Sequence, residues 1–190
     1  MNGSQMRTAI IITIVSIALL IAGCVRSLHP LYTDKDLVFE KDLIGTWAQK
    51  EGNKDTWIFQ QSGENAYDLI HTQKGAPAKF EAHLVRLDKF LFLDLFPDQP
   101  DTKNDFYKSH LIPAHTFSRI WIDGDLLRLA LFDNDWLKDM IARKKVTVKH
   151  ERLEDSIILT APTEELQQLV ITYATDTLAF PKPAELRRRN

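Results

Sequence analysis

The chain is poor in the residues that build disulfides, metal sites and nucleic-acid-binding faces. It has one cysteine in 190 residues, which excludes an intrachain disulfide. Its formal net charge of −2 leaves no excess of basic residues of the kind that binds nucleic acid. Its six histidines include no pair at the i, i+4 spacing of helical zinc ligands. We therefore expect neither a metal site nor a nucleic-acid partner.

Catalytic signatures are also missing: the sequence has no Gly-x-Ser-x-Gly, no phosphate-binding P-loop and no recognisable pair of carboxylates. Two weaker patterns are present. His110 and His115 flank Pro113 beside an aspartate-rich stretch, and a loose metal or proton-linked site there is an alternative. Residues 133–135 resemble the start of a calcium loop, but Lys144 stands where such a loop needs an acid, so helix capping explains them better. We expect no enzymatic activity and no cofactor.

The longest apolar run lies near the N-terminus. Met1–Arg7 is short and basic, and Thr8–Gly23 is almost wholly apolar, which is the layout of an export signal. The run is shorter than the roughly 20 apolar residues that a membrane-spanning helix needs. The small residues Ala22 and Gly23 end the run and suit a peptidase site. The sequence therefore predicts a cleaved signal peptide, with an uncleaved signal anchor as the alternative.

The run Leu20-Ile21-Ala22-Gly23-Cys24 resembles the lipobox of bacterial lipoproteins. The resemblance implies that residues 1–23 are removed and that a covalent lipid on Cys24 anchors the chain to a membrane. Val25, rather than an aspartate, follows the cysteine, which resembles the pattern passed on to the outer membrane in double-membraned bacteria. The implied location is the cell envelope, at the outer membrane and facing the periplasm.

The remaining chain is long enough for one domain with a good core. Residues 24–43 include Leu28, Leu31 and Phe39, so they are too apolar for a flexible stalk and are expected to pack on the domain. The domain itself is expected to span residues 44–180. Residues 181–190, with Arg187-Arg188-Arg189, are expected to form a solvated tail.

From residue 44 onward, short β segments alternate with turn signals. Asp123-Gly124-Asp125 is the strongest of these signals, because glycine accepts the positive φ that a tight hairpin turn requires. The predicted strands are 44–49, 55–60, 66–72, 79–87, 90–96, 117–122 and 126–132, with a possible eighth at 156–160.

The predicted strand 90–96 is apolar on both faces. Phe90 and Phe92 lie on one side and Leu91 and Leu93 on the other, so the strand needs cover on both sides. Helical periodicity at 134–144 and 163–174 predicts two amphipathic helices that supply the cover. We expect a mainly β domain: an antiparallel β-barrel or strongly curved meander sheet with two packed helices.

Gly45-Thr46-Trp47, on the first predicted strand, resembles the Gly-x-Trp signature of lipocalins and related calycin barrels. In that family the glycine lets the chain bend closely into the barrel base and the tryptophan plugs it. The resemblance implies a lipocalin-like barrel with Gly45 and Trp47 at its base, and an arginine that caps the tryptophan, for which Arg119 and Arg128 are both candidates. Trp47 as an ordinary core aromatic is the alternative.

An eight-stranded barrel can enclose one small ligand among its inward-facing side chains. We therefore expect a lipid-anchored, non-catalytic protein that binds an apolar small molecule or a lipid in a cavity of roughly 300 Å³ or more. A protein-interaction or assembly factor of the envelope with a solid barrel is the alternative, and an enzyme of unknown reaction is a second one. The candidate lining residues are large, apolar and alternate along the predicted strands: Trp57, Phe59, Tyr67, Leu69, Phe92 and Trp121.

Overall fold

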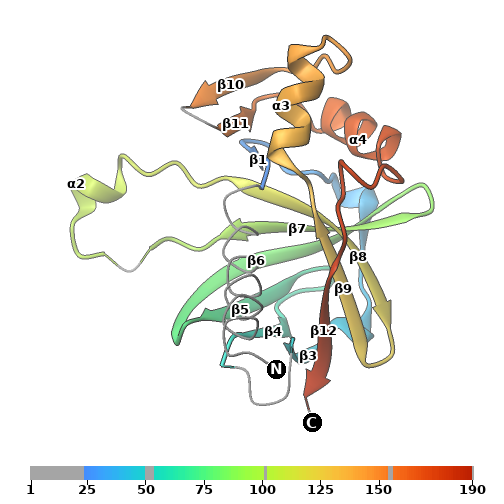
Figure 1. The fold of residues 1–190 in the computed structure, drawn as a ribbon. Coiled ribbons are helices and arrows are strands. Elements are labelled where there is room, and N and C mark those ends of the chain that lie inside the picture. The colour runs from blue at the N-terminus through green and yellow to red at the C-terminus, as the bar shows by residue number, and fades with distance from the viewer. Residues whose placement is uncertain (1–23, 50–53, 101, 154–155, 190) are drawn as a thin grey trace, which may run out of the picture.

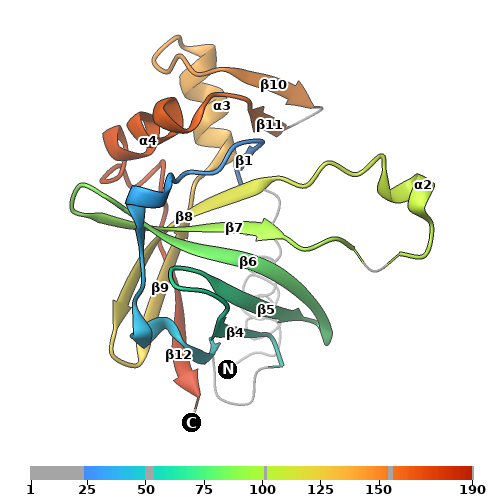
Figure 2. The same cartoon turned by 180° about the vertical axis from the view of Figure 1, so that it is seen from behind.

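The computed structural model describes residues 24–49, 54–100, 102–153 and 156–189. Eight antiparallel strands in these residues close into a barrel (Figures 1 and 2). Seven of them form a meander, and the eighth closes the ring between β9 and β3. The barrel strands are β3 (Gly45–Ala48), β4 (Thr56–Gln61), β5 (Tyr67–Gln73), β6 (Ala76–Leu87), β7 (Phe90–Pro97), β8 (His115–Asp123), β9 (Leu126–Leu131) and β12 (Ala184–Arg189).

Tight turns set the register of the meander. Lys74, Asp88 and Gly124 have φ values of 52°, 53° and 57° in the β5–β6, β6–β7 and β8–β9 turns. These positive values match the turns that follow the right-handed twist of the adjoining strands. The seven strands predicted between residues 44 and 132 are all present, with ends that differ by a few residues at most. The predicted barrel is confirmed.

The antiparallel order gives the barrel two unlike ends. The end that we call the base holds the start of β3 together with the β4–β5, β6–β7 and β8–β9 turns. The opposite end, the mouth, holds the β3–β4 and β5–β6 turns and the long β7–β8 connection. The chain also leaves and re-enters the barrel at the mouth, because an insertion separates β9 from β12.

This insertion forms a cap, at the top of Figure 1. It consists of α3 (Asn134–Ala142), β10 (His150–Leu153), β11 (Ser156–Leu159) and α4 (Thr163–Thr172). The short strand β1 (Arg26–Ser27) joins the cap to the barrel, since it pairs in parallel with β11 and antiparallel with β8. The two predicted helices are therefore present, and they cover the outer face of the barrel wall.

The barrel wall separates two hydrophobic cores, and β7 contributes to both. Leu91 and Leu93 point into the barrel, whereas Phe90 and Phe92 face the cap. The cap core unites Val25 and Leu31 with the outer face of β6 to β9, α3, β11 and α4. The buried members of the interior core are Leu43, Trp47, Phe59, Tyr67, Leu69, Ala82, Leu84, Leu93, Ile120, Leu127, Leu129 and Leu186.

Two expectations about the C-terminal half are wrong. The segment expected as the eighth strand, 156–160, does form β11, but β11 pairs with β1 and β10 outside the barrel. The true eighth strand is β12, inside the range 181–190 that was expected to be a tail. Leu186 is the one buried residue of this strand, and three arginines follow it. The sequence therefore lacks the alternation of apolar and polar residues that would predict a strand here.

The N-terminal residues of the described chain follow the barrel wall. Val25 and Leu31 are buried in the cap core, and β2 (Leu37–Val38) pairs with the end of β6. Two short 3-10 helices, η1 (Asp34–Asp36) and η2 (Lys41–Leu43), flank β2, and Leu43 enters the interior core at the base. The predicted signal peptide, 1–23, lies outside the described residues. Among the described residues, no helix has the length and hydropathy needed to span a bilayer.

Candidate functional site

Trp47 closes the base of the barrel and is completely buried. Its indole N–H donates to the backbone oxygen of Leu43 at 2.9 Å. The guanidinium of Arg188, on β12, lies over the indole ring, with 4.3 Å between Cζ and the ring centroid. A capping arginine is therefore present, but it is Arg188 and not Arg119 or Arg128. Both of those arginines lie on the outer face of the wall, beside Trp121.

Gly45 makes room for this arginine. Its φ is +136°, and a Cβ atom at this position would lie 2.6 Å from Nη1 of Arg188. The guanidinium donates to the backbone oxygens of Ile44 and Asp42, each at 2.6 Å, and its Nε pairs with the Asp125 carboxylate at 3.1 Å. The polar groups of the base are thus paired within the chain, which makes the base a structural seal.

The barrel interior is largely filled by the side chains that face it. Phe59, Tyr67 and Leu69 point inward and are at most 1% exposed. The Tyr67 hydroxyl accepts from the Glu40 N–H at 2.6 Å and donates to the Glu40 carbonyl at 3.2 Å. Burial raises the pKa of this phenol to about 12. Phe39 stacks on the Tyr67 ring at 5.1 Å, so these side chains pack against one another.

Phe92 and Trp121 face outward and do not line the interior. Phe92 belongs to the cap core, with its ring centroid 5.9 Å from that of Phe180. Trp121 lies on the outer wall against the guanidinium of Arg119. The alternation along β7 and β8 is visible in the sequence, but both faces of these strands are apolar. The pattern therefore does not tell which face is inside.

A cavity of about 160 Å³ opens at the mouth, next to Trp57. The Trp57 ring lies 4.7 Å from the ring of His71, and Leu129, Leu131 and Leu186 add apolar lining. Burial lowers the pKa of His71. The cavity is about half the roughly 300 Å³ expected of a lipid-sized or drug-sized site. It is close to the ~150 Å³ that admits a single benzene-sized molecule.

A buried polar cluster lies beneath the N-terminal segment, and the sequence reasoning missed it. Asp94 is 1% exposed; its Oδ1 lies 2.7 Å from Nδ1 of His115, and its Oδ2 accepts the Leu31 N–H at 2.7 Å. Tyr32 lies on His83 with ring centroids 4.4 Å apart, and burial lowers the pKa of His83. Within the described ranges no serine or threonine hydrogen-bonds to His115, so the pair lacks a triad hydroxyl. The cluster attaches the N-terminal segment to the wall.

The alternative metal site at His110 and His115 does not assemble. His115 is engaged with Asp94, while Nδ1 of His110 lies 2.7 Å from the backbone oxygen of Phe106. Over the part of the chain that the structure describes, no three His, Cys, Asp or Glu side chains gather in a way that could hold a metal. Asp133 caps α3 by accepting the Trp136 N–H at 2.7 Å, which confirms the capping interpretation.

The β7–β8 connection, residues 98–114, projects from the mouth as an arm (Figures 1 and 2). It contains α2 (Asp105–Lys108), a single turn that Asn104 caps by accepting the Tyr107 N–H at 2.9 Å. Phe106 and Ile112 are each 78% exposed. Four of the seven exposed large hydrophobic residues in the described chain lie on the arm: Phe106, Tyr107, Leu111 and Ile112. The sequence analysis noted only the aspartate-rich stretch of this segment and did not single out these four residues.

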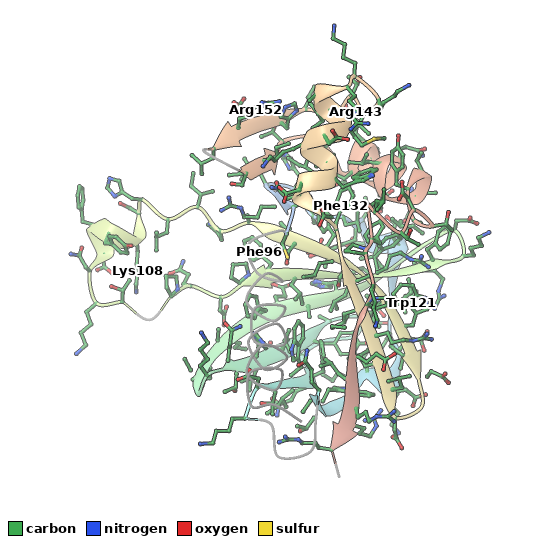
Figure 3. The ribbon with its side chains drawn as sticks, viewed as in Figure 1. Phe96, Lys108, Trp121, Phe132, Arg143 and Arg152 are labelled. Carbon is green, nitrogen blue, oxygen red and sulfur yellow. The ribbon has the colours of Figure 1, made fainter. Side chains whose placement is uncertain are left out.

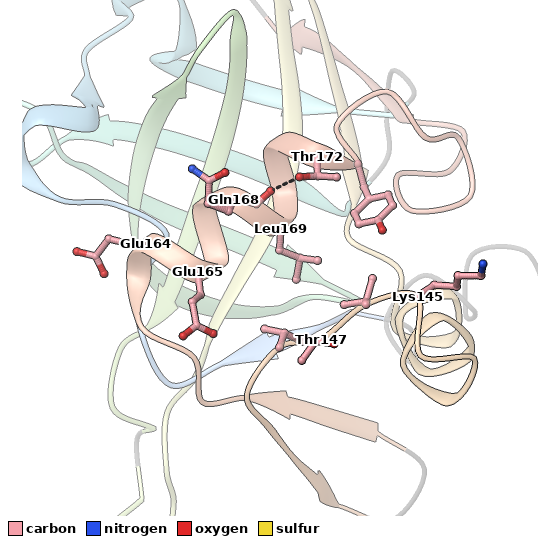
Figure 4. Close-up of a pocket in the computed structure, with 10 residues that line it drawn as sticks. Lys145, Thr147, Glu164, Glu165, Gln168, Leu169 and Thr172 are labelled. Carbon is pink, nitrogen blue, oxygen red and sulfur yellow. Dashed lines mark hydrogen bonds between the residues drawn. The ribbon is translucent and has the colours of Figure 1, made fainter.

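A second hollow, of about 420 Å³, lies on the cap between α4 and residues 145–148 (Figure 4). Glu164, Glu165 and Lys145 are at its edge, and the Thr172 hydroxyl donates to the Gln168 carbonyl within α4 at 2.7 Å. Its lining has neither histidine nor cysteine. Lys145, Glu164 and Glu165 are its charged groups, and the groove is open to solvent.

Cys24 lies where the cap meets the barrel, and its backbone forms a bridge with Asp133. Burial and, secondly, the charge of Asp133 raise the pKa of the thiol to about 11. A thiol with so high a pKa is almost fully protonated at neutral pH, so it is a poor nucleophile.

These features define a mainly β protein with a closed, eight-stranded, up-and-down barrel of lipocalin-like build, to which a cap and an arm are added. Comparison of the chain with protein-family models, with curated proteins and with solved structures gave no match. Its function therefore has to be argued from its own surfaces.

Proposed function

We propose that this protein is a lipid-anchored envelope lipoprotein that docks on another envelope protein through its arm, with the barrel as a solid scaffold. The observation that carries the proposal is the clustering of Phe106, Tyr107, Leu111 and Ile112, all exposed, on one projecting segment. Monomeric proteins rarely expose contiguous apolar patches unless these are interaction sites. The anchor is inferred from the run that ends at Cys24.

The arm is held in shape by its own hydrogen bonds. The N–H groups of Lys108 and Ser109 donate to the carbonyls of Asn104 and Asp105, each at 3.0 Å, and the Leu111 N–H donates to the Lys108 carbonyl at 3.0 Å. The arm therefore presents its apolar side chains without folding them back on the barrel. A preformed docking element loses less conformational entropy on binding than a disordered loop.

The charge and size of the arm favour a protein partner over a lipid surface. Residues 98–114 contain three aspartates and two lysines, so anionic headgroups would repel the arm slightly. The helix α2 has four residues, which is too short to lie in a bilayer interface as an amphipathic helix. Aromatic side chains such as Phe106 and Tyr107 are enriched in the centres of protein interfaces.

The arm and the anchor leave the barrel at neighbouring points. The arm ends where β8 begins, at His115, and His115 is the register partner of Ser27 in β1, three residues after Cys24. A lipid on Cys24 would therefore keep the point where the arm joins β8 close to the membrane. We expect the partner to be a protein at the same membrane.

Binding of a small apolar or aromatic ligand at the mouth is a second candidate function. The 160 Å³ cavity beside Trp57 and His71 supports it, although a whole lipid would not fit. Titration with indole, followed by the fluorescence lifetime of the protein and compared between wild type and Trp57→Leu, tests this function. Saturable binding that the substitution abolishes would support it, and no saturable binding would exclude it.

The docking proposal is tested with the variant Phe106→Ser/Ile112→Ser and the control Leu178→Ser. Leu178 is 70% exposed but lies on the C-terminal side of α4, away from the arm in the sequence. Native electrophoresis of mildly extracted envelopes should give wild type and the control in a complex larger than the monomer, and the arm variant as monomer. A monomeric wild type, or an arm variant that stays in the complex, would contradict the proposal.

A further inference from the structure

A cluster of cations and aromatic rings lies on the outer wall of the barrel, near the base. It surrounds a hollow of about 360 Å³ formed by the β6–β7 turn, β8 and β9. Cζ of Arg119 lies 4.4 Å from the ring centroid of Trp121 and 4.8 Å from that of Phe90. Cζ of Arg128 lies 5.8 Å from the Trp121 ring, and Nζ of Lys89 lies 5.4 Å from the Phe90 ring.

These three cations have no carboxylate partner. No ion pair of the described residues includes Lys89, Arg119 or Arg128, whereas Arg86, Arg143 and Arg188 are each paired with an acid. Two acidic side chains lie nearby without pairing: Asp123, which lines the hollow, and Glu185, the register partner of Arg128.

The two arginines also have unused hydrogen-bonding capacity. The Nε atoms of Arg119 and Arg128 are buried and have no acceptor in the structure. Arg119 is held in place by a hydrogen bond from Nη1 to the carbonyl of Ala174, which follows α4. Burial lowers its pKa, in keeping with a guanidinium that has lost water without gaining an anion. Buried donors of this kind are normally hydrogen-bonded, so two donors without an acceptor indicate that a ligand supplies one.

We propose that Lys89, Arg119 and Arg128 bind the phosphate group of a ligand whose apolar part rests on Phe90 and Trp121. A phosphate monoester supplies close to two negative charges and three acceptor oxygens, which suits two guanidinium groups and an ammonium group better than a carboxylate does. The site is separate from the arm: Figure 3 shows Trp121 and Lys108 on opposite sides of the barrel. The phosphate belongs either to a soluble metabolite or to a lipid headgroup.

Calorimetric titration of the full chain with phenyl phosphate tests the proposal, with Arg128→Gln as the main variant. Among the described residues the Arg128 side chain has no hydrogen bond, so this change should leave folding intact, which a denaturant midpoint verifies. We expect saturable binding that weakens about tenfold in Arg128→Gln, because a charge-assisted hydrogen bond is lost, and that is partly kept in Arg128→Lys. Arg86→Gln, which breaks an ion pair with Glu40 elsewhere on the wall, should bind as wild type does.

A second probe distinguishes the sources of the phosphate. Tighter binding of monomeric dihexanoyl phosphatidic acid than of phenyl phosphate would assign the site to a lipid headgroup, and the reverse order would assign it to a soluble phosphate ester. Failure of both probes to saturate, or equal affinities for wild type and Arg128→Gln, would overturn the proposal. None of these outcomes depends on whether the arm docks a protein.

Discussion

The aromatic side chains are buried at one end of the barrel and partly or largely exposed at the other. At the base, Trp47 is fully buried, its N–H has an acceptor in Leu43, and Arg188 covers its ring. At the mouth, Trp57 is half-buried beside a cavity, and Phe106 on the arm is 78% exposed. The polar groups described around Trp47 are paired within the chain, whereas the mouth leaves apolar surface uncovered. The comparison assigns stability to the base and protein docking to the mouth.

The largest expected effect is the loss of the plug at the base. Trp47→Ala should lower the free energy of unfolding by about 3 to 5 kcal/mol, because it removes a fully buried aromatic ring and leaves a cavity. Trp57→Ala, at the mouth, should lower the free energy of unfolding clearly less, because the Trp57 ring is only half-buried. Urea unfolding of both variants measures the difference. Equal losses would remove the distinction between the two ends.

The arginine over the plug should have the next largest effect. Arg188→Ala removes the contact with Trp47 and leaves the carbonyls of Asp42 and Ile44 without their donor, which we expect to cost about 2 kcal/mol. Arg187→Ala is the matched control, since Arg187 is exposed on the same strand and should change stability by less than about 0.5 kcal/mol. Similar denaturant midpoints for the two variants would show that Arg188 is a surface residue in solution.

Acid should weaken the fold through buried histidines away from the base. Burial lowers the pKa of His71 at the mouth and of His83 beneath the N-terminal segment, so the folded state favours their neutral forms. The contribution of these neutral histidines to the free energy of unfolding is complete above the unfolded-state pKa of about 6.5. It is lost as the pH falls below that value. Glu81 and Asp94 oppose the effect at His83, while His115 adds to it. The free energy of unfolding of His83→Gln should therefore fall less steeply with acid than that of wild type. A steeper fall would contradict the assigned direction.

The smallest effect on stability is expected at the arm. Phe106→Ser and Ile112→Ser should each change the free energy of unfolding by less than about 0.5 kcal/mol, because both side chains are already exposed to water. Thermal melts of the purified variants measure this effect. A loss of more than 1 kcal/mol, about twice that limit, would mean that the arm folds back onto the barrel in solution.

The sequence predicted the barrel well because its signals are local. Period-two alternation and turn residues such as Gly124 determine strand positions over short windows, and the apolar faces of α3 and α4 follow from helical spacing. In the structure Gly45 and Trp47 both lie at the base, where the close approach of Arg188 and a buried indole require those residue types.

What escaped prediction depends on contacts between distant segments. Arg188 lies over 140 residues from Trp47 in the chain, so no local pattern links the two. Phe92 occupies a strand with two apolar faces, and only the position of the cap decides that it points outward. The pairing of Asp94 with His115 arises from adjacent strands joined by a long arm. The exposure of Phe106 is equally invisible in sequence, where it reads as an ordinary apolar residue.

The central claim is that protein docking occurs at the mouth and not at the base. Photo-crosslinking amino acids placed singly at Ile112 on the arm, and at Glu64 in the exposed β4–β5 turn of the base, test it in intact cells. The account predicts a cross-linked adduct of defined mass from position 112 and none from position 64. An adduct from position 64 alone, or equal labelling at both positions, would contradict it.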